Sequence, residues 1–600
     1  MTANSNTDNA TTKGRDDGAD GGDAPDAPDA PDTPDTPDAK PARTIRWFLA
    51  LVVLFLGGSG LVYEYCLSTV ATHLLGNSIE QFSVIIALML SAMGVAGMIQ
   101  GWFKKEKHLA AIFVAVEIGL GTVGGSSAVL LYLAFAYLEH FRLVLYLLAV
   151  AIGFGIGMEI PLLMRINQRW QPQLRRNVGQ VFSLDYLGAL GGALIWAFVL
   201  LPLFALDRIS LILGLVNLGV ALVTLTVFWR QLTHRMALVV LLVTSVLGLT
   251  AFTLGSPRLV KTARQHLYAQ PIRHHEQTPY QDIVITGRGA RLSLFLNGRL
   301  QLDSEDEFIY HELLVHPALM ALGRPPRDVL VLGGGDGLAV REILKWRSVR
   351  RVTLVDLDPA MTRLARTYGP LVKLNGGSLR SRRVREIPPA GITDGMALRT
   401  IHKYAERPRL AVRRHSEPVA RVRVRNLDAD RFIAAVPDRY DVILADFPDP
   451  RSPDLAKLYS LEFYLQLRHR LQPGGLVVTQ AGSPYSTRRA YWCVHDTLRE
   501  AGFAVLPLQA HIPTFGVWGF HLARYGSTPP APAGRPPNHV PLRYLTGPVL
   551  AATTVFPPHL ERPASAARQV STRLDPRVMR YYLKGEPLSG PHLFSGTAKR

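Results

Sequence analysis

The sequence predicts two structural parts: a multi-pass α-helical membrane domain, and an α/β Rossmann-like domain with a small N-terminal β unit. Three observations lead to this prediction. Seven apolar runs of membrane-spanning length lie between residues 44 and 256. Strand and helix patterns alternate over 327–525, and a glycine-rich loop joins two apolar strands there. Six hundred residues also exceed the usual size of one compact domain, which favours at least two domains.

The two ends of the chain differ in composition from these parts. The formal net charge is +19 and the apolar fraction is 48%, which suggests a nucleic-acid or anionic membrane partner. Residues 1–43 are rich in proline and aspartate and show no signal-peptide pattern, so we expect an acidic disordered tail. Residues 526–600 form a proline-rich extension with a helical pattern near Pro576–Leu583. The two cysteines, Cys66 and Cys493, predict neither a disulfide framework nor a cysteine-based zinc site.

Each apolar run is long enough for the roughly 20 residues that cross a bilayer as a helix. Small residues are dense within the runs, as in Gly57-Gly58-Ser59-Gly60, which favours close packing between helices. We therefore expect a transmembrane domain of about seven helices in the cell membrane, with the lipid bilayer as a partner. The runs lie near residues 46–70, 82–103, 109–137, 141–164, 183–206, 209–229 and 236–255.

Basic residues are distributed unevenly between the two sides of these runs. One side carries 12 lysines and arginines, whereas only Arg142 and Arg208 fall in the loops of the other side. The positive-inside rule then places the N-terminus in the cytoplasm, and seven spans would place the C-terminal half outside. The supply of a nucleoside cofactor favours a cytoplasmic C-terminal half, which we expect; an external half and a run that does not span remain the alternatives. The 12 residues are Lys40, Arg43, Arg46, Lys104, Lys105, Lys107, Arg165, Arg169, Arg175, Arg176, Arg230 and Arg235.

Four acidic residues, Glu64, Glu117, Glu159 and Asp185, lie within or beside the apolar runs. Ionisable groups are costly in a bilayer and usually face a cavity or a partner. The functional interpretation is a path for a cation. The structural alternative is that the acids bridge helices by pairing with residues such as Arg165.

Residues 272–326 are expected to form the small β unit and a helix. Apolar and polar residues alternate around glycine-containing turns over 280–303, which is typical of antiparallel strands. A helical pattern follows over Ser304–Leu322. His311 and His316 are five positions apart on it, so they point to different faces and no zinc-binding pair is predicted.

The glycine-rich loop lies between two predicted parallel strands. The strand pattern at Val329–Leu332 leads into Gly333–Gly337, and the pattern at Val352–Val355 ends in Asp356. A strand–loop–helix–strand unit with an acid about 20 residues past the glycines is the arrangement that holds a nucleoside cofactor in Rossmann-like folds. The loop therefore predicts a nucleoside site in a methyltransferase-type domain.

The side chains around this loop narrow the ligand. Gly333 and Gly335 allow the backbone to approach the ligand closely, and Asp356 can accept both ribose hydroxyls. Asp336 would repel the carboxylate of ordinary S-adenosylmethionine or the phosphates of NAD. A cationic ligand tail would be attracted to it.

Between about residues 379 and 425 the α/β pattern lapses. This stretch carries 13 arginines or lysines against four acidic residues, so anionic lipid or nucleic acid could contact it. Aromatic residues do not alternate with the basic ones, as they would on a base-stacking surface. We therefore expect a solvated basic insertion and no nucleic-acid partner.

The α/β alternation resumes at Asp428-Ala429, which opens a helix. The expected strands that follow are Tyr440–Ala445, Gly475–Ala481, Phe503–Leu508 and Phe515–Leu522, and the expected helices are Leu461–Leu471 and Arg488–Ala501.

Five carboxylates fall at or just after the carboxyl ends of predicted strands: Asp336, Asp356, Asp428, Asp446 and Asp449. Ligands of a doubly wound sheet bind at this edge. Without Cys or His clusters, the set suggests a polycationic substrate; a divalent metal is the alternative, although its acids are usually spaced more tightly.

A primary amine has a pKa of about 10.4 and must lose a proton before it attacks. Asp446 could accept that proton and Asp449 could anchor a second ammonium, whereas the structural alternative is a strand cap and a turn.

Several motifs, in this order, resemble the spermidine synthase (polyamine aminopropyltransferase) family, and the chain is similar to its membrane-fused bacterial branch. The resemblance covers about Tyr280 to Leu522 and is interrupted by the basic insertion. The matching residues are Tyr280-Gln281-Asp282-Ile283, Leu296-Asn297-Gly298 with Gln301, Asp306–Glu312, Gly333–Gly337, Asp356, Asp428-Ala429, Asp446–Pro450 and Leu458-Tyr459.

The resemblance implies transfer of the aminopropyl group of decarboxylated S-adenosylmethionine to putrescine or a similar amine. The products would be spermidine and methylthioadenosine, with no bound cofactor or metal, and a homo-oligomer is a further expectation. The implied donor-binding residues are Gln281, Gly333, Gly335, Asp336, Asp356, Asp428 and Ala429. The implied catalytic residues are Asp446, as the base, and Tyr310. The implied acceptor contacts are Gln301, Tyr310, His311, Asp336 and Asp449.

Three positions depart from the family's pattern. Its usual Ser or Thr pair between the two aspartates is Phe447-Pro448 here, and its Leu-Asp-Gly is Leu296-Asn297-Gly298. Its late Pro-Thr-Tyr segment reads Pro513-Thr514-Phe515, which removes a phenol near the acceptor.

Two other functions remain as alternatives. An S-adenosylmethionine-dependent methyltransferase is disfavoured by Asp336, which would meet the carboxylate of the methyl donor. A polyamine transporter or sensor would bind the nucleoside without turnover, and the presence of Asp446 and Tyr310 favours activity instead.

Overall fold

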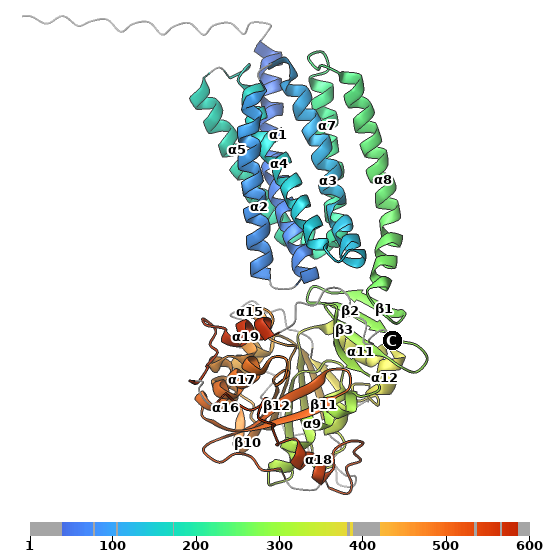
Figure 1. Cartoon of the computed structure of the whole chain (residues 1–600), viewed down its shortest axis with the longest axis vertical. Coiled ribbons are helices and arrows are strands. Elements are labelled where there is room, and N and C mark those ends of the chain that lie inside the picture. Colours follow the sequence, from blue (N-terminus) through green and yellow to red (C-terminus); the bar gives the residue numbers. More distant parts are fainter. Residues whose placement is uncertain are drawn as a thin grey trace, which may run out of the picture.

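The computed structural model describes residues 39–75, 78–103, 106–171, 173–380, 384–387, 421–532, 537–563 and 567–585. They form a bundle of long helices with an α/β domain at one end (Figure 1). Most of the predicted acidic tail, the central part of the predicted basic insertion and the last residues of the C-terminal extension lie outside the described residues.

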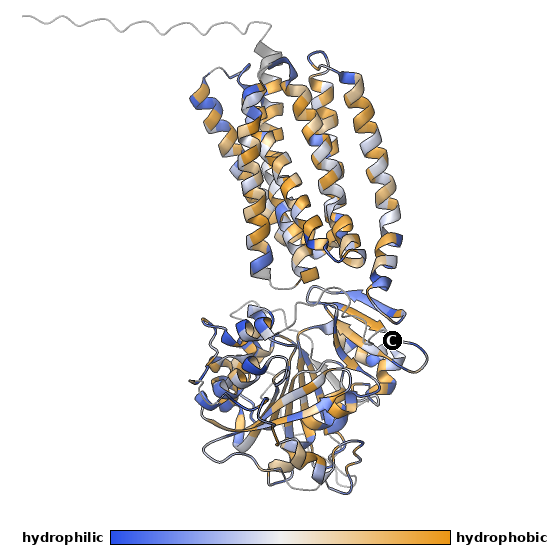
Figure 2. Cartoon of the chain, in the orientation of Figure 1, coloured by the Kyte–Doolittle hydropathy of each residue, from blue (hydrophilic) through white to orange (hydrophobic). Residues whose placement is uncertain are grey.

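Seven helices of the described part are long and apolar enough to cross a membrane, in agreement with the seven predicted runs. Apolar residues cover their length, as Figure 2 shows. Helix α5 begins before the predicted run because its first turns are polar, and α8 continues beyond its run towards the α/β domain. The long helices are α1 (Ala39–Leu75), α2 (Ser78–Ile99), α3 (Leu109–Tyr137), α4 (Phe141–Asn167), α5 (Leu174–Ile195), α7 (Leu206–Val227) and α8 (Arg235–His266). Short turns lie at η1 (Gln100–Trp102), η2 (Glu106–His108), η3 (Trp196–Leu200) and α6 (Leu201–Leu203).

Glycines bring helices of the bundle into backbone contact, as the dense small residues predict. A Cβ atom on Gly188 of α5 would lie 1.9 Å from the carbonyl oxygen of Leu54 on α1. A Cβ atom on Gly192 would lie 2.4 Å from the carbonyl oxygen of Gly58. Because no side chain fits between these helices, the α1–α5 packing depends on glycine at both positions.

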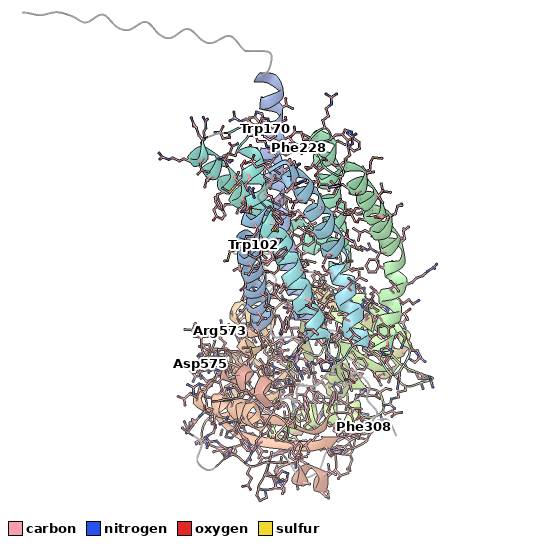
Figure 3. All side chains as sticks on the ribbon, turned by 45° about the horizontal axis from the view of Figure 1, so that its top comes forward. Trp102, Trp170, Phe228, Phe308, Arg573 and Asp575 are labelled. Carbon is pink, nitrogen blue, oxygen red and sulfur yellow. The ribbon has the colours of Figure 1, made fainter. Side chains whose placement is uncertain are left out.

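The chain enters the bundle at the end remote from the α/β domain and leaves α8 next to that domain (Figure 1). Trp170 and Phe228, whose ring centroids are 5.8 Å apart, lie at the remote end (Figure 3). Arg165 and Arg169 also lie there, near the end of α4, whereas Arg142 and Arg208 begin α4 and α7 at the domain end. Most of the basic residues therefore lie at the end of the bundle remote from the α/β domain. The positive-inside rule would place that end in the cytoplasm, which still conflicts with a cytoplasmic catalytic half.

Two of the acidic residues, Glu117 and Glu159, are buried side by side between α3 and α4. Within the described residues, neither carboxylate oxygen of Glu117 has a hydrogen-bond partner. Arg165 donates instead to backbone carbonyls after α2, so the suggested pairing with these acids is wrong. Glu64 and Asp185 remain partly exposed.

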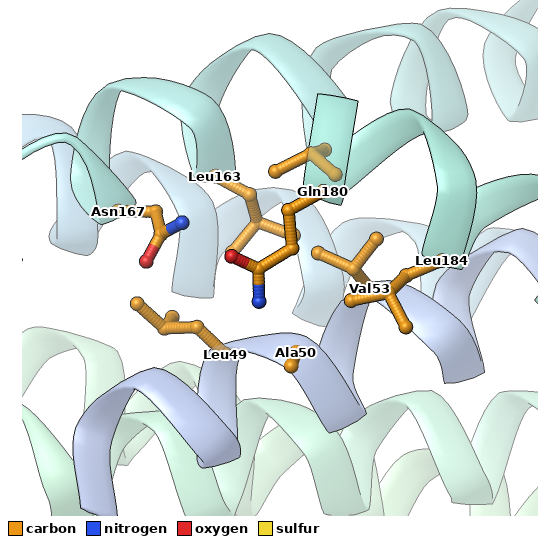
Figure 4. Close-up of a pocket in the computed structure, with 8 residues that line it drawn as sticks. Leu49, Ala50, Val53, Leu163, Asn167, Gln180 and Leu184 are labelled. Carbon is orange, nitrogen blue, oxygen red and sulfur yellow. The ribbon is translucent and has the colours of Figure 1, made fainter. Parts of the chain in front are cut away.

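A small pocket lies between α1, α4 and α5 (Figure 4). It is lined mostly by leucine and valine side chains, with Asn167 and Gln180 as its polar groups. The Asn167 amide donates to Asn177 at 2.8 Å, and Asn177 donates to the Met164 carbonyl at 2.8 Å. All of the described lining residues belong to the helix bundle and none is charged. The pocket is therefore separate from the predicted catalytic residues of the α/β domain.

A four-stranded antiparallel sheet forms the small β unit, as predicted, and packs against the bundle. Tyr268, just after α8, stacks edge-on against Phe295 with ring centroids 4.9 Å apart. Both belong to one apolar cluster with Phe135 and Phe141 of the bundle. The elements are β1 (Ile272–Gln277), β2 (Asp282–Thr286), β3 (Ser293–Leu296), β4 (Arg299–Asp303) and α9 (Glu307–Ala321).

The larger sheet has eight strands in the order β11-β12-β10-β9-β5-β6-β8-β7. Strands β10 to β7 of this order run parallel, and β12 pairs antiparallel with both β10 and β11. The strands are β5 (Asp328–Gly333), β6 (Arg351–Asp356), β7 (Val384–Ile387), β8 (Arg421–Asn426), β9 (Tyr440–Asp446), β10 (Leu471–Gln480), β11 (Phe503–Ile512) and β12 (Gly516–Tyr525). The helices are α10 (Leu338–Ile343), α11 (Pro359–Thr367), α12 (Gly369–Leu374), α14 (Ala429–Ala435), α15 (Pro453–Ala456), η4 (Lys457–Tyr459), α16 (Leu461–His469), α17 (Arg488–Glu500), α18 (Gly547–Ala552) and α19 (Arg577–Gly585).

The structure corrects both ends of the predicted basic insertion, because β7 near its start and β8 at its end are strands of the larger sheet. Residues 421–426 form β8, which pairs in parallel with β6 inside the sheet. Val422 and Val424 are buried, while Arg421 is exposed. Arginines at every second position therefore mark one face of a strand and not a solvated loop.

Replacing Gly188 with alanine should weaken the α1–α5 contact, because the new Cβ atom would collide with the Leu54 carbonyl. We expect destabilisation of about 1–3 kcal/mol, seen as a lower thermal midpoint of the detergent-solubilised protein. Gly191→Ala is the matched control, since nothing lies within 4 Å of a Cβ atom there. Equal midpoints for the two variants would contradict this account.

Candidate active site

The pairing of β5 with β9 brings the glycine-rich loop against Asp446. Gly333 is the register partner of Asp446 at the carboxyl ends of the two strands. A Cβ atom on Gly333 would lie 2.0 Å from the Asp446 carbonyl oxygen, and its φ of 81° also requires glycine. A Cβ atom on Gly335 would lie 2.5 Å from the carboxylate of Asp356. Two predicted functional carboxylates therefore border one loop.

Asp356, the predicted ribose anchor, is fixed by backbone amides. Its two oxygens accept hydrogen bonds from the amides of Gly335 and Asp358, each at 2.9 Å. Burial raises the pKa of Asp356 to about 7, although these two amides oppose the shift. The neighbouring carboxylate of Asp358 accepts hydrogen bonds from Thr278 and Gln281, each at 2.9 Å. Gln281 and Asp356, predicted to hold the same part of the donor, thus belong to one network.

Asp336 and Asp428 each use one carboxylate oxygen to accept hydrogen bonds from backbone amides near the start of a helix. Asp336 accepts from the amide of Leu338 at 2.8 Å, and Asp428 caps α14 just before the buried Ala429. The second oxygen of Asp428 accepts from the Lys457 ammonium at 2.8 Å. Burial opposes ionisation of Asp428, but Lys457 holds its pKa below the usual range. The predicted contact of Asp428 with adenine remains a prediction.

The structure brings together the two predicted catalytic residues, Tyr310 of α9 and Asp446 of β9. The Tyr310 hydroxyl donates to Asp446 Oδ1 at 2.7 Å. Burial raises the pKa of Asp446 to about 6, and Asp336 adds to the shift while His311 opposes it. Burial and the Asp446 charge raise the pKa of Tyr310 well above its ordinary value, so the phenol keeps its proton. This arrangement leaves Asp446 able to accept a further proton at neutral pH.

His311 has a different contact from the amine contact predicted for it. Its Nδ1 atom lies 3.0 Å from the Glu307 carboxylate. Burial alone would lower the pKa of His311, but Glu307 outweighs burial and raises it to about 9. A cationic ring near Asp446 stabilises that carboxylate and would repel an ammonium. His316 instead bonds Glu342 at 2.8 Å, so the two histidines face different partners, as predicted.

Around Asp449, the structure adds three residues whose roles sequence reasoning missed. The Gln480 amide donates to the Phe447 carbonyl at 2.7 Å and lies 2.6 Å from the Tyr459 hydroxyl and 3.4 Å from Asp449 Oδ1. The Tyr582 hydroxyl donates to Asp449 Oδ2 at 2.6 Å. Gln480 could have been found, because it ends a strand at the same edge of the sheet. Tyr459 belongs to Leu458-Tyr459, one of the motifs that carry the family resemblance. No sequence pattern indicated that Tyr582 would contact Asp449.

One departure from the family's pattern has a structural explanation, and Thr514, which precedes the departing Phe515, has a structural role. Asn297 has a φ of 49° and forms the β3–β4 turn with Gly298, a conformation that asparagine tolerates. Thr514 donates through both its amide and its hydroxyl to Asp306, at 2.8 and 3.0 Å, and so holds the start of α9. Gln301 hydrogen-bonds a carbonyl of its own strand, and its contact with the acceptor remains a prediction.

Comparisons with known proteins agree with this geometry. The spermine/spermidine synthase domain model matches residues 307–387 and 394–528. Polyamine aminopropyltransferase 1 of Streptomyces coelicolor is 42% identical over 552 residues, which cover 90% of this chain and 94% of the relative. The chain belongs to the spermine/spermidine synthase family. Polyamine aminopropyltransferase of Leptospira interrogans is 39% identical, covering 79% of this chain and 87% of that protein.

A crystal structure of a spermidine synthase in complex with the transition-state analogue AdoDATO is 21% identical to this family member. It covers 48% of this chain and 85% of that one, with a TM-score of 0.38. This chain is an aminopropyltransferase that uses decarboxylated S-adenosylmethionine as a substrate and not as a resident cofactor. Because the Streptomyces relative aligns over 90% of the chain, its match extends into the helix bundle.

The acid side of the pH profile should report Asp446. A base with a pKa of about 6 is active above that pH and is lost as the pH falls through it. We expect kcat/KM for the acceptor to fall about tenfold per pH unit well below pH 6. Tyr310→Phe removes a hydrogen bond that favours the carboxylate and should move this limb to higher pH. Fluorescence across the same pH range controls for unfolding, and a limb that does not move would contradict the assignment.

Proposed function

We propose that this aminopropyltransferase uses putrescine, or a diamine of similar length, as its acceptor and forms spermidine and methylthioadenosine. The observation that supports this most directly is the 2.7 Å hydrogen bond between Tyr310 and Asp446 beside the glycine-rich loop. It places a partly desolvated base where a nucleoside-bound donor would present its reacting carbon.

The donor would bind along the carboxyl ends of β5 and β6. Gly333 and Gly335 leave room for its nucleoside next to the backbone, and Asp356 with Gln281 would hold the ribose region. Asp336 supplies the charge that distinguishes donors. The aminopropyl tail of the decarboxylated molecule ends in an ammonium, which Asp336 attracts. Ordinary S-adenosylmethionine would bring a carboxylate to the same place.

The chemical step is a displacement at the carbon beside the sulfonium. The nitrogen lone pair of the acceptor forms the new N–C bond, while the C–S bond breaks and its electrons return to sulfur. Methylthioadenosine therefore leaves as a neutral thioether. Asp446 takes the proton that the amine loses, and Tyr310 keeps that carboxylate oriented. Because Asp446 and Tyr310 form no covalent bond with the substrates, the positioning of donor and acceptor should supply much of the rate acceleration.

The acceptor would lie between Asp446 and Asp449, which are separated by Phe447-Pro448. Its reacting nitrogen would face Asp446, and its second ammonium would face Asp449. This arrangement would favour a diamine over a monoamine, since the second charge would be bound apart from the reacting one.

We also propose that the enzyme works embedded in the cell membrane, with its catalytic domain in the cytoplasm. The seven long apolar helices support membrane insertion, and the cytoplasmic supply of the donor supports this orientation. The basic residues at the remote end of the bundle favour the opposite orientation. The buried pair Glu117 and Glu159 is the feature that favours the alternative of cation transport.

The reaction can be tested with the purified full-length chain and putrescine. We expect methylthioadenosine and spermidine with decarboxylated S-adenosylmethionine, and neither with S-adenosylmethionine. Asp446→Asn should lower kcat by about 100-fold or more while leaving methylthioadenosine binding unchanged. Asp454→Asn, an exposed carboxylate on α15, is the matched control. Methyl transfer, or a decarboxylated donor that is never consumed, would refute the proposed function.

The orientation can be tested by labelling intact cells with a membrane-impermeant maleimide. Cys66 and Cys493 are buried, so the native chain should give little background. Tyr485→Cys places a thiol on the catalytic domain, where the native side chain is 68% exposed. Gln231→Cys places one at the remote end of the bundle. We expect only Gln231→Cys to react in intact cells and both to react after lysis; the reverse pattern would place the catalytic domain outside.

A further inference from the structure

The C-terminal extension returns to the acceptor end of the active site. Tyr582 of α19 is only 4% exposed, and its hydroxyl donates to Asp449 Oδ2 at 2.6 Å. The two residues are 133 positions apart in the sequence, and α19 lies beyond the region matched by the family model. The contact is therefore made by a segment that lies outside the matched domain.

Helix α19 is held firmly in this position. Val578 and Met579 are buried with Tyr582 in the apolar cluster that lies on one side of the sheet. Asp575, labelled in Figure 3, forms ion pairs with Arg577 and Arg580 at the start of the helix. Several independent contacts thus fix the phenol.

Arg451 supports the phenol from the other side. Its guanidinium donates to the Tyr582 hydroxyl at 3.1 Å and lies 4.9 Å from the ring centroid. The Arg451 backbone amide also donates to the Asp449 carbonyl at 2.8 Å. The Tyr582 hydroxyl therefore accepts from a cation and donates to a carboxylate, which fixes the direction of its proton and the rotamer of Asp449.

We propose that Tyr582 determines acceptor specificity by bordering the Asp449 end of the acceptor site and orienting Asp449 towards the second ammonium. This inference rests on the proposed function, in which Asp449 binds that ammonium. The phenol stands in for hydroxyls that Phe515 and Phe447-Pro448 do not provide. Arg451, which donates to the Tyr582 hydroxyl, would bring a positive charge towards any acceptor that extends past Asp449 with another ammonium. The acceptor site therefore selects a diamine over a longer triamine.

The first test is Tyr582→Phe in the full-length enzyme. We expect KM for putrescine to rise about tenfold, because a hydrogen bond to a charged group is lost. KM for the decarboxylated donor and the thermal midpoint should remain unchanged, and kcat should change little. Tyr581→Phe is the matched control: its hydroxyl bonds Gln569 at 2.5 Å on the same helix. Similar kinetics for the two variants would overturn the inference.

A second test removes the ring and the charge together. Tyr582→Ala with Arg451→Ala should open the Asp449 end of the acceptor site, so that the ratio of kcat/KM for spermidine to kcat/KM for putrescine rises at least tenfold. In an Asp449→Asn background, Tyr582→Phe should add no further increase in KM for putrescine. An unchanged ratio, or additive effects with Asp449→Asn, would overturn the role of Tyr582. A wild-type enzyme that never uses putrescine would instead refute the proposed function itself.

Discussion

The active site depends on one close approach, that of Gly333 to the backbone of Asp446. The parallel register of β5 and β9 makes these residues neighbours at the edge of the sheet. Without a Cβ atom, the glycine loop can turn directly over the strand that carries the base. Any side chain at Gly333 would push the loop and Asp446 apart. Donor and acceptor would then lose the alignment that a displacement at carbon requires.

The electrostatics of the base follow from the helix placed opposite it. Helix α9 supplies Tyr310, whose hydroxyl fixes one oxygen of Asp446, and His311, whose charge keeps the raised pKa of that carboxylate from rising further. The C-terminal extension holds this helix, because Glu312 accepts hydrogen bonds from three consecutive backbone amides, those of residues 543–545. The extension therefore supports the site twice, through α9 and through Tyr582 of α19.

The helix bundle is continuous with the donor side of the site. Tyr268 and Phe295 join the bundle to the β unit, and Gln281 lies in the turn between β1 and β2 of that unit. The Gln281 side chain in turn contacts Asp358, which borders Asp356, the predicted ribose anchor. The packing of the bundle thus supports the β unit that carries Gln281, one of the predicted donor-binding residues. The Streptomyces coelicolor relative aligns over 90% of this chain, so its sequence match includes both parts.

Local patterns in the sequence determined most of the fold. Apolar runs gave the seven long helices, and alternation of strands with helices gave the Rossmann-like sheet, because each pattern reflects burial of a whole element. The same patterns located Asp446, Asp356 and the glycine loop, since strand ends in a parallel sheet share one edge. The alternation of arginine and valine in β8 was wrongly interpreted as part of a solvated insertion. The many positive charges suggested a loop, although a repeat of two residues is typical of a strand.

Other features were decided only by tertiary structure. The contact of Tyr582 with Asp449 joins segments 133 residues apart, and no local pattern encodes such a distance. The charge on His311 depends on Glu307 outweighing burial, a balance that only the packed site defines. The sequence by itself thus determined the family and located Asp446, the predicted base. The packed chain decided which side chains surround Asp449, the predicted acceptor contact, because hydrogen bonds between distant segments form only after folding brings them together.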